Sequence, residues 1–167
     1  MKRVSVRTVL TDPVHFLAFG FGAGLAPRAP GTFGTAVGAF GTAVGVLIGL
    51  GLAPLSLSLR AWVVLAVCLA GVWICGESAR RLGEHDHPGI VWDEIAGYLL
   101  TMLAAPPGWP WIVAGFCLFR LFDIWKPWPI RDLDHGLSGG SGIMLDDLVA
   151  GVYAAAVLLS ARFLAGG

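Results

Sequence analysis

The chain has 167 residues, of which 56% are hydrophobic and only 13% are charged, and its mean hydropathy is +0.77. An average soluble domain carries about 25% charged residues, so this composition argues against a soluble enzyme. The eleven basic and eleven acidic residues cancel, which leaves no basic surface of the kind that binds nucleic acid, and the length suits a single domain over residues 1–167.

Residues 16–30 are interpreted as a short interfacial segment that leads into a membrane. Gly20, Gly22 and Gly24 give a superficial match to a dinucleotide-binding loop. No strand precedes them and no βαβ unit surrounds them, so the match carries little weight. We expect these glycines to loosen the segment rather than to bind a nucleotide.

The first membrane span is predicted within residues 29–59, which contain no charged side chain and end as a helix near Pro54. About 20 residues suffice to cross a bilayer. The span contains a seven-residue repeat, FGTAVGA followed by FGTAVGV, and small residues at such spacing let helices approach closely. We expect this glycine face to pack inside the chain; the alternative is the seam of a homo-oligomer. Its glycines are Gly34, Gly38, Gly41 and Gly45.

Four further helices follow the first span. Residues 61–76 are uncharged and can continue as a helix to residue 81. Residues 95–119 are also uncharged, but the prolines in residues 106–110 divide them into two short helices. A fifth helix is expected over residues 148–161. The sequence therefore predicts an all-α, polytopic helical membrane protein with about five transmembrane or half-length helices and an interfacial N-terminal segment.

Charge predicts the orientation of these helices. With the N-terminus in the cytoplasm, nine of the eleven basic residues lie on the cytoplasmic side and only Arg60 and Arg162 lie outside, as the positive-inside rule expects. All eleven acidic residues also fall on the cytoplasmic side, although no topology rule requires it. This asymmetry indicates a functional use for acidic side chains on that face.

Five acids at predicted helix ends are the candidate site. Asp93 and Glu94 begin the third helix, Asp123 lies in the last turn of the fourth, and Asp146 and Asp147 precede the fifth. Each pair alone fits ordinary helix capping. Asp123 instead faces the negative end of a helix dipole and needs a cation. Because five carboxylates repel one another unless they are neutralised, we expect them to bind a divalent ion with oxygen ligands, and Mg²⁺ fits best.

Groups suited to a phosphate surround these acids. Lys126 and Arg131 lie on a loop stiffened by prolines, and the alternative for each is anchoring to anionic lipid. Gly139 and Gly140 belong to a glycine-rich loop before the fifth helix, which either presents backbone N–H groups to an anion or is only a flexible connection. Asp86, between two histidines, is a further candidate for a general acid or a ligand, and the alternative is that it makes only polar contacts within its loop.

A second phosphatase pattern is considered accidental. Cys75 and Arg81 match the Cys-x5-Arg spacing of cysteine phosphatases. That chemistry needs a thiolate in an electropositive loop. Here the cysteine ends an apolar helix and Glu77 lies two residues further on, so we expect no catalytic role for it.

Four motifs, in order along the chain, resemble those of the phosphatidylglycerophosphatase A family. They are GFGAGLAPRAPGT (20–32), HDHPGIVWDEIAG (85–97), FRLFDIWKPWPIRDLD (119–134) and GGSGIMLDDLVAG (139–151). The resemblance covers nearly the whole chain from Pro13 onwards. It implies an all-helical, Mg²⁺-dependent enzyme of the bacterial inner membrane that hydrolyses phosphatidylglycerophosphate to phosphatidylglycerol and phosphate at the cytoplasmic face.

The resemblance also assigns residues. It implies that the five acids form the acidic centre and that Lys126, Arg131 and Asp134 belong to the adjoining motif, with Thr32 in the first motif as a weaker candidate. We expect Mg²⁺ to bridge the acids and the phosphate, Lys126 or Arg131 to take developing charge, and one carboxylate that does not bind the metal to act as general base. The alternative mechanism forms a covalent aspartyl-phosphate.

Two other functions stay open. One is a Mg²⁺-dependent membrane phospholipid transferase, which would need an alcohol acceptor and would release no free phosphate. The other is a non-enzymatic transporter or scaffold, in which acids within the membrane would line an ion path. The acids cluster on one face and none lies at the middle of a span, which disfavours the ion path.

Overall fold

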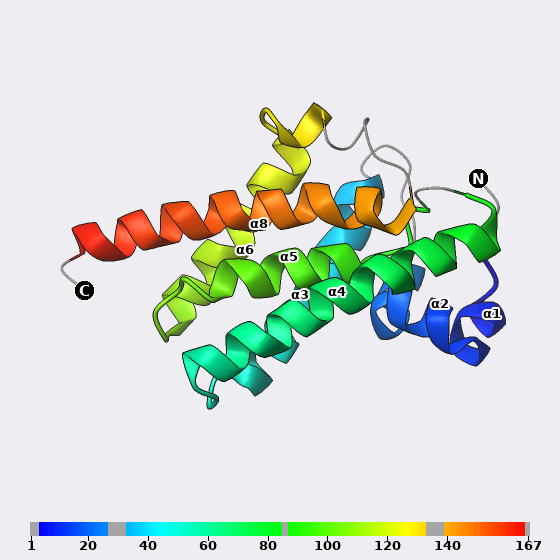
Figure 1. The fold of residues 1–167 in the computed structure, drawn as a ribbon, viewed down its shortest axis with the longest axis horizontal. Coiled ribbons are helices and arrows are strands. Elements are labelled where there is room, and N and C mark those ends of the chain that lie inside the picture. Colours follow the sequence, from blue (N-terminus) through cyan, green and yellow to red (C-terminus); the bar gives the residue numbers. More distant parts are fainter. Residues whose placement is uncertain (1–3, 27–32, 85–86, 133–138, 166–167) are drawn as a thin grey trace.

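The regular structure in the described part of the chain is helical, as predicted (Figure 1). The computed structural model describes residues 4–26, 33–84, 87–132 and 139–165. Its N-terminal part consists of α1 (Val6–Thr11), α2 (Pro13–Ala18) and the 3-10 helix η1 (Gly20–Leu25). The longer helices are α3 (Phe33–Leu52), α4 (Leu57–Leu82), α5 (Trp92–Met102), α6 (Trp109–Trp125) and α8 (Gly139–Leu164).

The short helix α5 lies at the centre of the bundle. It packs against α3, α4, α6 and α8, and its contact with α8 is the most extensive of the fold. With 11 residues α5 is about 17 Å long, whereas α4 and α8, with 26 residues each, are about 39 Å long. The half-length helix predicted before the prolines is therefore present, and it runs along only part of its neighbours.

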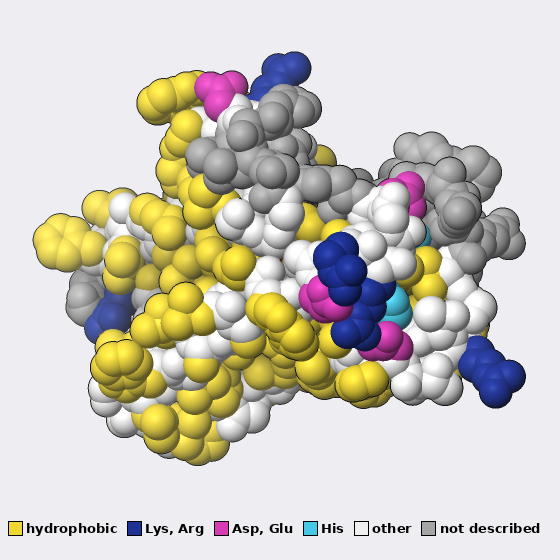
Figure 2. All heavy atoms as spheres, turned by 45° about the vertical axis from the view of Figure 1, so that its right-hand side comes forward, with side chains coloured by type: hydrophobic (Ala, Val, Ile, Leu, Met, Phe, Trp, Pro, Cys, Tyr) yellow, Lys and Arg dark blue, Asp and Glu magenta, His cyan; other side chains and the backbone are white. Residues whose placement is uncertain are grey.

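Two described helices, α4 and α8, are long and apolar enough to cross a membrane. The count of about five spans is not confirmed. Helix α4 exposes large apolar side chains, among them Trp62, Leu69 and Trp73, as a helix in contact with lipid does. Figure 2 shows hydrophobic side chains over much of the face in view, with one group of charged side chains near its centre and single charged side chains at its edges.

Small residues let α5 and α8 cross in close contact. A Cβ atom at Gly151 would lie 2.5 Å from the carbonyl oxygen of Gly97, and one at Gly97 would lie 2.7 Å from the carbonyl oxygen of Asp147. The Thr101 hydroxyl donates hydrogen bonds to the carbonyls of Gly97 and Gly151, at 3.0 and 3.2 Å. Since Asp93 is one turn before Gly97 and Asp147 one turn before Gly151, this crossing brings acids from two helices together.

The glycine repeat of α3 also packs within the chain. A Cβ atom at Gly41 would lie 2.7 Å from the side chain of Val91, and one at Gly45 would lie 3.1 Å from the ring of Tyr98. Gly38 faces the side chains of Glu94 and Arg120. The intramolecular packing expected of this face is therefore confirmed for these three glycines.

The predicted start of the last helix is wrong by nine residues. The described part of the glycine-rich segment, predicted as a loop, is helical, because α8 begins at Gly139 although glycine intrinsically disfavours helices. Tertiary packing explains the difference: Gly140 lies directly against the backbone of α4 at Val72, where any side chain would overlap it. Asp146 and Asp147 consequently lie two turns inside α8, and neither is a helix cap.

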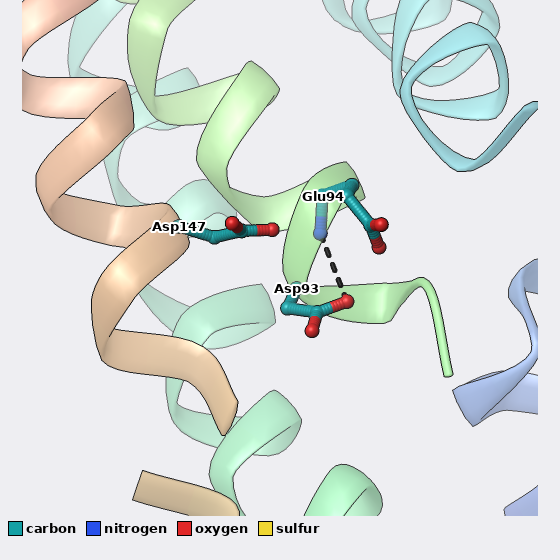
Figure 3. A group of neighbouring side chains, drawn as sticks. All are labelled: Asp93, Glu94 and Asp147. Atoms are coloured by element: carbon teal, nitrogen blue, oxygen red, sulfur yellow. Dashed lines mark hydrogen bonds between the residues drawn. The ribbon is translucent and has the colours of Figure 1, made fainter. Parts of the chain in front are cut away.

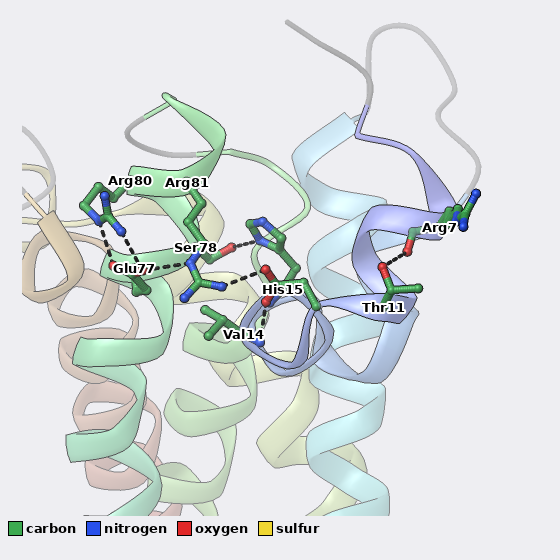
Figure 4. Close-up of polar contacts among 9 residues, drawn as sticks. Arg7, Thr11, Val14, His15, Glu77, Ser78, Arg80 and Arg81 are labelled. Carbon is green, nitrogen blue, oxygen red and sulfur yellow. Dashed lines mark hydrogen bonds and ion pairs between the residues drawn. The ribbon is translucent and has the colours of Figure 1, made fainter.

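Polar contacts attach the N-terminal helices to the end of α4 (Figure 4). Nδ1 of the buried His15 is 2.9 Å from Oγ of Ser78, and Nη1 of Arg81 is 2.7 Å from Oδ2 of Asp12. Asp12 also caps α2 by accepting hydrogen bonds from the N–H groups of Val14 and His15. Burial by itself raises the pKa of Asp12, but the hydrogen bonds from Arg81 and these N–H groups outweigh it and lower the pKa.

Candidate acidic centre

Three carboxylates converge where α5 begins beside α8. Asp93 and Glu94 lie in the first turn of α5, and Asp147 comes from α8. One carboxylate oxygen from each lies within 4.8 Å of the other two. Figure 3 shows the Asp147 side chain reaching toward the start of α5, where the N–H of Glu94 donates a 3.1 Å hydrogen bond to Asp93. The convergence predicted for these three acids is present in the structure.

Helix α6 adds Asp123 together with a buried arginine. Nη1 of Arg120 is 2.6 Å from Oδ2 of Asp123 and 3.9 Å from Oε1 of Glu94. Asp123 also interacts with Asp147 and Glu94. The sequence required a cation for Asp123 at the negative end of its helix, and this cation is Arg120, only 7% exposed. Arg120 is absent from the predicted site residues, although its spacing three residues before Asp123 is a sequence signal for this ion pair.

The neighbouring acid Asp146 has a different partner. Its Oδ2 is 2.8 Å from Nζ of Lys126, the residue that ends α6 in the left-handed conformation with φ 44°. Asp146 also interacts with Asp147, so Lys126 is held at the edge of the cluster. Lys126, expected to bind phosphate, therefore lies beside the acids and is already paired with one of them.

The donor set fits an oxygen-ligated divalent cation. Asp93 and Asp147 are buried, and Oε2 of Glu94 is buried with no hydrogen-bond partner among the described residues. Buried carboxylates at this separation repel one another, and low exposure to water deprives them of screening. Carboxylate oxygens are also the ligands that Mg²⁺ prefers. Asp93, Glu94 and Asp147 could hold such an ion, with Asp123 beside them.

The remaining predicted residues are placed less centrally. Arg131 is exposed, and within the described part of the chain no ion pair joins it to the five acids. Gly139 and Gly140 form the first turn of α8 rather than a loop. The candidates Thr32, Asp86 and Asp134 lie outside the described residues.

The Cys-x5-Arg pattern does not form a phosphate-binding loop. Cys75 is 0% exposed, and its Sγ lies 3.8 Å from Sδ of Met144 in the hydrophobic core. Arg81 points instead to Glu77 and Asp12, with which it forms ion pairs (Figure 4). The pattern is therefore accidental, as expected.

Comparison with known proteins points to one family. A family model described as phosphatidylglycerophosphatase A matches residues 16–162. The chain is 44% identical over 153 residues to phosphatidylglycerophosphatase A of Escherichia coli K12, covering 91% of this chain and 85% of that protein. It is 42% identical over 166 residues to phosphatidylglycerophosphatase A of Haemophilus influenzae, covering 98% and 94%.

The name of a third relative indicates a different substrate. The chain is 36% identical over 169 residues to a protein of Bacteroides thetaiotaomicron named as a candidate phosphatidylinositol-3-phosphatase, covering 99% of this chain and 100% of that protein. No solved structure matches the chain.

Proposed function

The chain belongs to the phosphatidylglycerophosphatase A family, and we propose that it removes the terminal phosphate of phosphatidylglycerophosphate to give phosphatidylglycerol and phosphate. The observation that carries this proposal is the buried cluster of Asp93, Glu94 and Asp147, with Asp123 beside it. The phosphomonoester of a lipid head group lies at a membrane surface. If apolar helices such as α4 and α8 hold the protein in the membrane, the acyl chains of the substrate can stay in the bilayer while its phosphate reaches the acids.

We propose Mg²⁺ as the cofactor, held by Asp93, Glu94 and Asp147, with Asp123 and Asp146 completing the acidic centre. When bound, such an ion neutralises the carboxylates and polarises the phosphate. The unpartnered Oε2 of Glu94 and the all-oxygen donor set support this assignment.

The other residues of the site bind, orient and move protons. Lys126, held by Asp146, donates to a phosphate oxygen and stabilises the charge that develops there. Arg131 and the first turn of α8 at Gly139 and Gly140 are further proposed phosphate contacts, because helix N-termini attract anions. One carboxylate of the cluster accepts the proton of the attacking water.

The proposed setting is a multi-pass protein of the bacterial inner membrane, with the acidic centre at the cytoplasmic face. The named relatives are bacterial, and α4 and α8 could span a bilayer. Lys126 and Arg120 lie at the acidic end of the bundle, while Arg60 lies near the start of α4 and Arg162 lies in the last turn of α8, at the other end. This distribution supports the orientation through the positive-inside rule.

Chelation tests the metal and the reaction together. Phosphate release from phosphatidylglycerophosphate by the purified protein should stop in EDTA and return when Mg²⁺ is added in excess, because few other groups can neutralise the cluster. Release that resists EDTA would contradict the metal centre but not the phosphatase. Faster release from phosphatidylinositol 3-phosphate would contradict the proposed substrate, and release only in the presence of an alcohol acceptor would favour the transferase.

Replacing Cys75 tests the rival cysteine chemistry. Cys75→Ala should leave turnover near that of the unmodified protein and lower the free energy of unfolding by about 1 kcal/mol, since it removes one buried sulfur from the core. Thermal unfolding and phosphate release, measured on the same preparation, separate the two effects. Loss of turnover in a folded variant, together with sensitivity of the unmodified protein to thiol alkylation, would instead support a cysteine nucleophile.

A further inference from the structure

A cavity of about 60 Å³ lies at the end of the bundle opposite the acidic centre. It forms where α5 stops, because this central helix is too short to fill the space between α3 and α6. Met102, in its wall, is eight residues beyond Glu94 on α5, which places it about 12 Å further along the helix. The wall is largely apolar and includes Val46, Leu50, Tyr98, Met102 and Ile112.

Arg60 is the charged residue among the described side chains that line this cavity. Its Nε is buried and has no hydrogen-bond partner among the described residues. The chain contains no acidic residue between Asp12 and Glu77, nor between Glu94 and Asp123, and the cavity wall comes from within these two stretches. In addition, Arg60 lies in the first turns of α4, where the helix dipole disfavours a cation.

A partly buried guanidinium with no counter-ion nearby is costly, and an anionic ligand would offset that cost. A purely polar ligand does not match this site, because free phosphate would pair with Arg60 but leave the apolar wall of the cavity uncovered. An uncharged lipid would cover the wall but leave Arg60 unpaired. The pairing of one fixed cation with an apolar cavity therefore matches an anionic amphiphile.

We propose that this cavity is a second lipid site, which binds one anionic phospholipid of the leaflet opposite the acidic centre. The lipid phosphate binds the guanidinium of Arg60, close to the start of α4, where a phosphate at a bilayer surface is within reach. An acyl segment of the same lipid packs against Leu50, Met102 and Ile112. The site is separate from the acidic centre and takes no part in phosphate hydrolysis.

Binding of dioleoyl phosphatidylglycerol to the purified protein in an uncharged detergent tests the proposal, with the number of bound lipids counted by native mass spectrometry. Arg60→Gln should weaken binding at this site about tenfold, because it removes a charge-assisted contact. Gly49→Leu should weaken it comparably by filling the cavity, since the position of a Cβ atom at Gly49 has only ordinary contacts, 3.6 Å to Leu99 and 3.9 Å to Tyr98.

The matched control is Arg162→Gln, which removes an exposed arginine from the last turn of α8 and should leave binding unchanged. Dioleoyl phosphatidylcholine and inorganic phosphate should each compete poorly. Equal binding in Arg60→Gln and the unmodified protein, or equal loss in Arg162→Gln, would overturn the proposal, as would displacement of the lipid by inorganic phosphate alone. Turnover of phosphatidylglycerophosphate should be retained in Arg60→Gln, and its loss in a folded variant would contradict the separation of the two sites.

Discussion

Asp147→Asn is expected to lower turnover about a thousandfold or more, whereas the same change at the neighbouring Asp146 should cost far less. Asp147 is 4% exposed, and one of its oxygens lies within 4.8 Å of oxygens of Asp93 and Glu94. Its charge is thus part of the proposed ion site, and losing a preorganised charge at a reacting centre has effects of this size. Asp146 instead holds Lys126, so its loss releases one cation and leaves the three-carboxylate cluster intact.

Stability distinguishes this loss of function from misfolding. Asparagine has nearly the volume of aspartate, and Asp147→Asn removes one of several charges that repel one another in a buried cluster. In the absence of Mg²⁺ its thermal midpoint should therefore equal or exceed that of the unmodified protein, a trade of stability for activity that is common at active sites. Turnover and thermal midpoint should be measured with and without Mg²⁺. A larger loss of turnover in Asp146→Asn than in Asp147→Asn would contradict the proposed ligand set.

The acids could be located from the sequence because they interrupt or border apolar runs. Asp93 and Glu94 directly precede the uncharged run 95–119, and Asp123 lies shortly after it, so their positions at helix ends follow from the charge pattern. The sequence singles out Asp147 as a candidate site residue, but it places this acid just before the last helix and not inside α8, because the glycine-rich segment predicts a loop there. The contact of Gly140 with α4 is a tertiary property that no local pattern reveals.

The arrangement of helices was harder to predict than their existence. The prolines in residues 106–110 correctly indicated that α5 is short. Its central position could not be predicted, because uniformly apolar helices lack the polar face that identifies the outside of a soluble bundle. Arg120 could not be assigned for a related reason. An arginine at the end of an apolar run fits both a cation at the cytoplasmic membrane surface and a buried counter-ion of an acid. Only the packing of α3, α5 and α6 distinguishes these two roles.

Arg120→Gln should both destabilise and inactivate the protein. Arg120 pairs with Asp123 at 2.6 Å and approaches Glu94 at 3.9 Å, and α3 covers it so closely that a side chain at Gly38 would overlap its guanidinium. Breaking a buried ion pair by removing one partner typically costs about 3–5 kcal/mol of unfolding free energy, because the remaining charge is left uncompensated. Turnover should fall as well, since Asp123 and Glu94 lose the group that orients them.

The response to Mg²⁺ makes the assignment of Arg120 specific. If Arg120 stabilises the cluster by its charge, Mg²⁺ should raise the thermal midpoint of Arg120→Gln more than that of the unmodified protein, because the ion supplies the missing positive charge. Arg120→Lys, which keeps the charge but not the planar fork, should lie between the two in stability. Arg162→Gln is the control, and removal of this exposed arginine should change the unfolding free energy by less than about 0.5 kcal/mol. A midpoint of Arg120→Gln equal to that of the unmodified protein would mean that the carboxylates are neutralised by other groups and that Arg120 only fills space beneath α3.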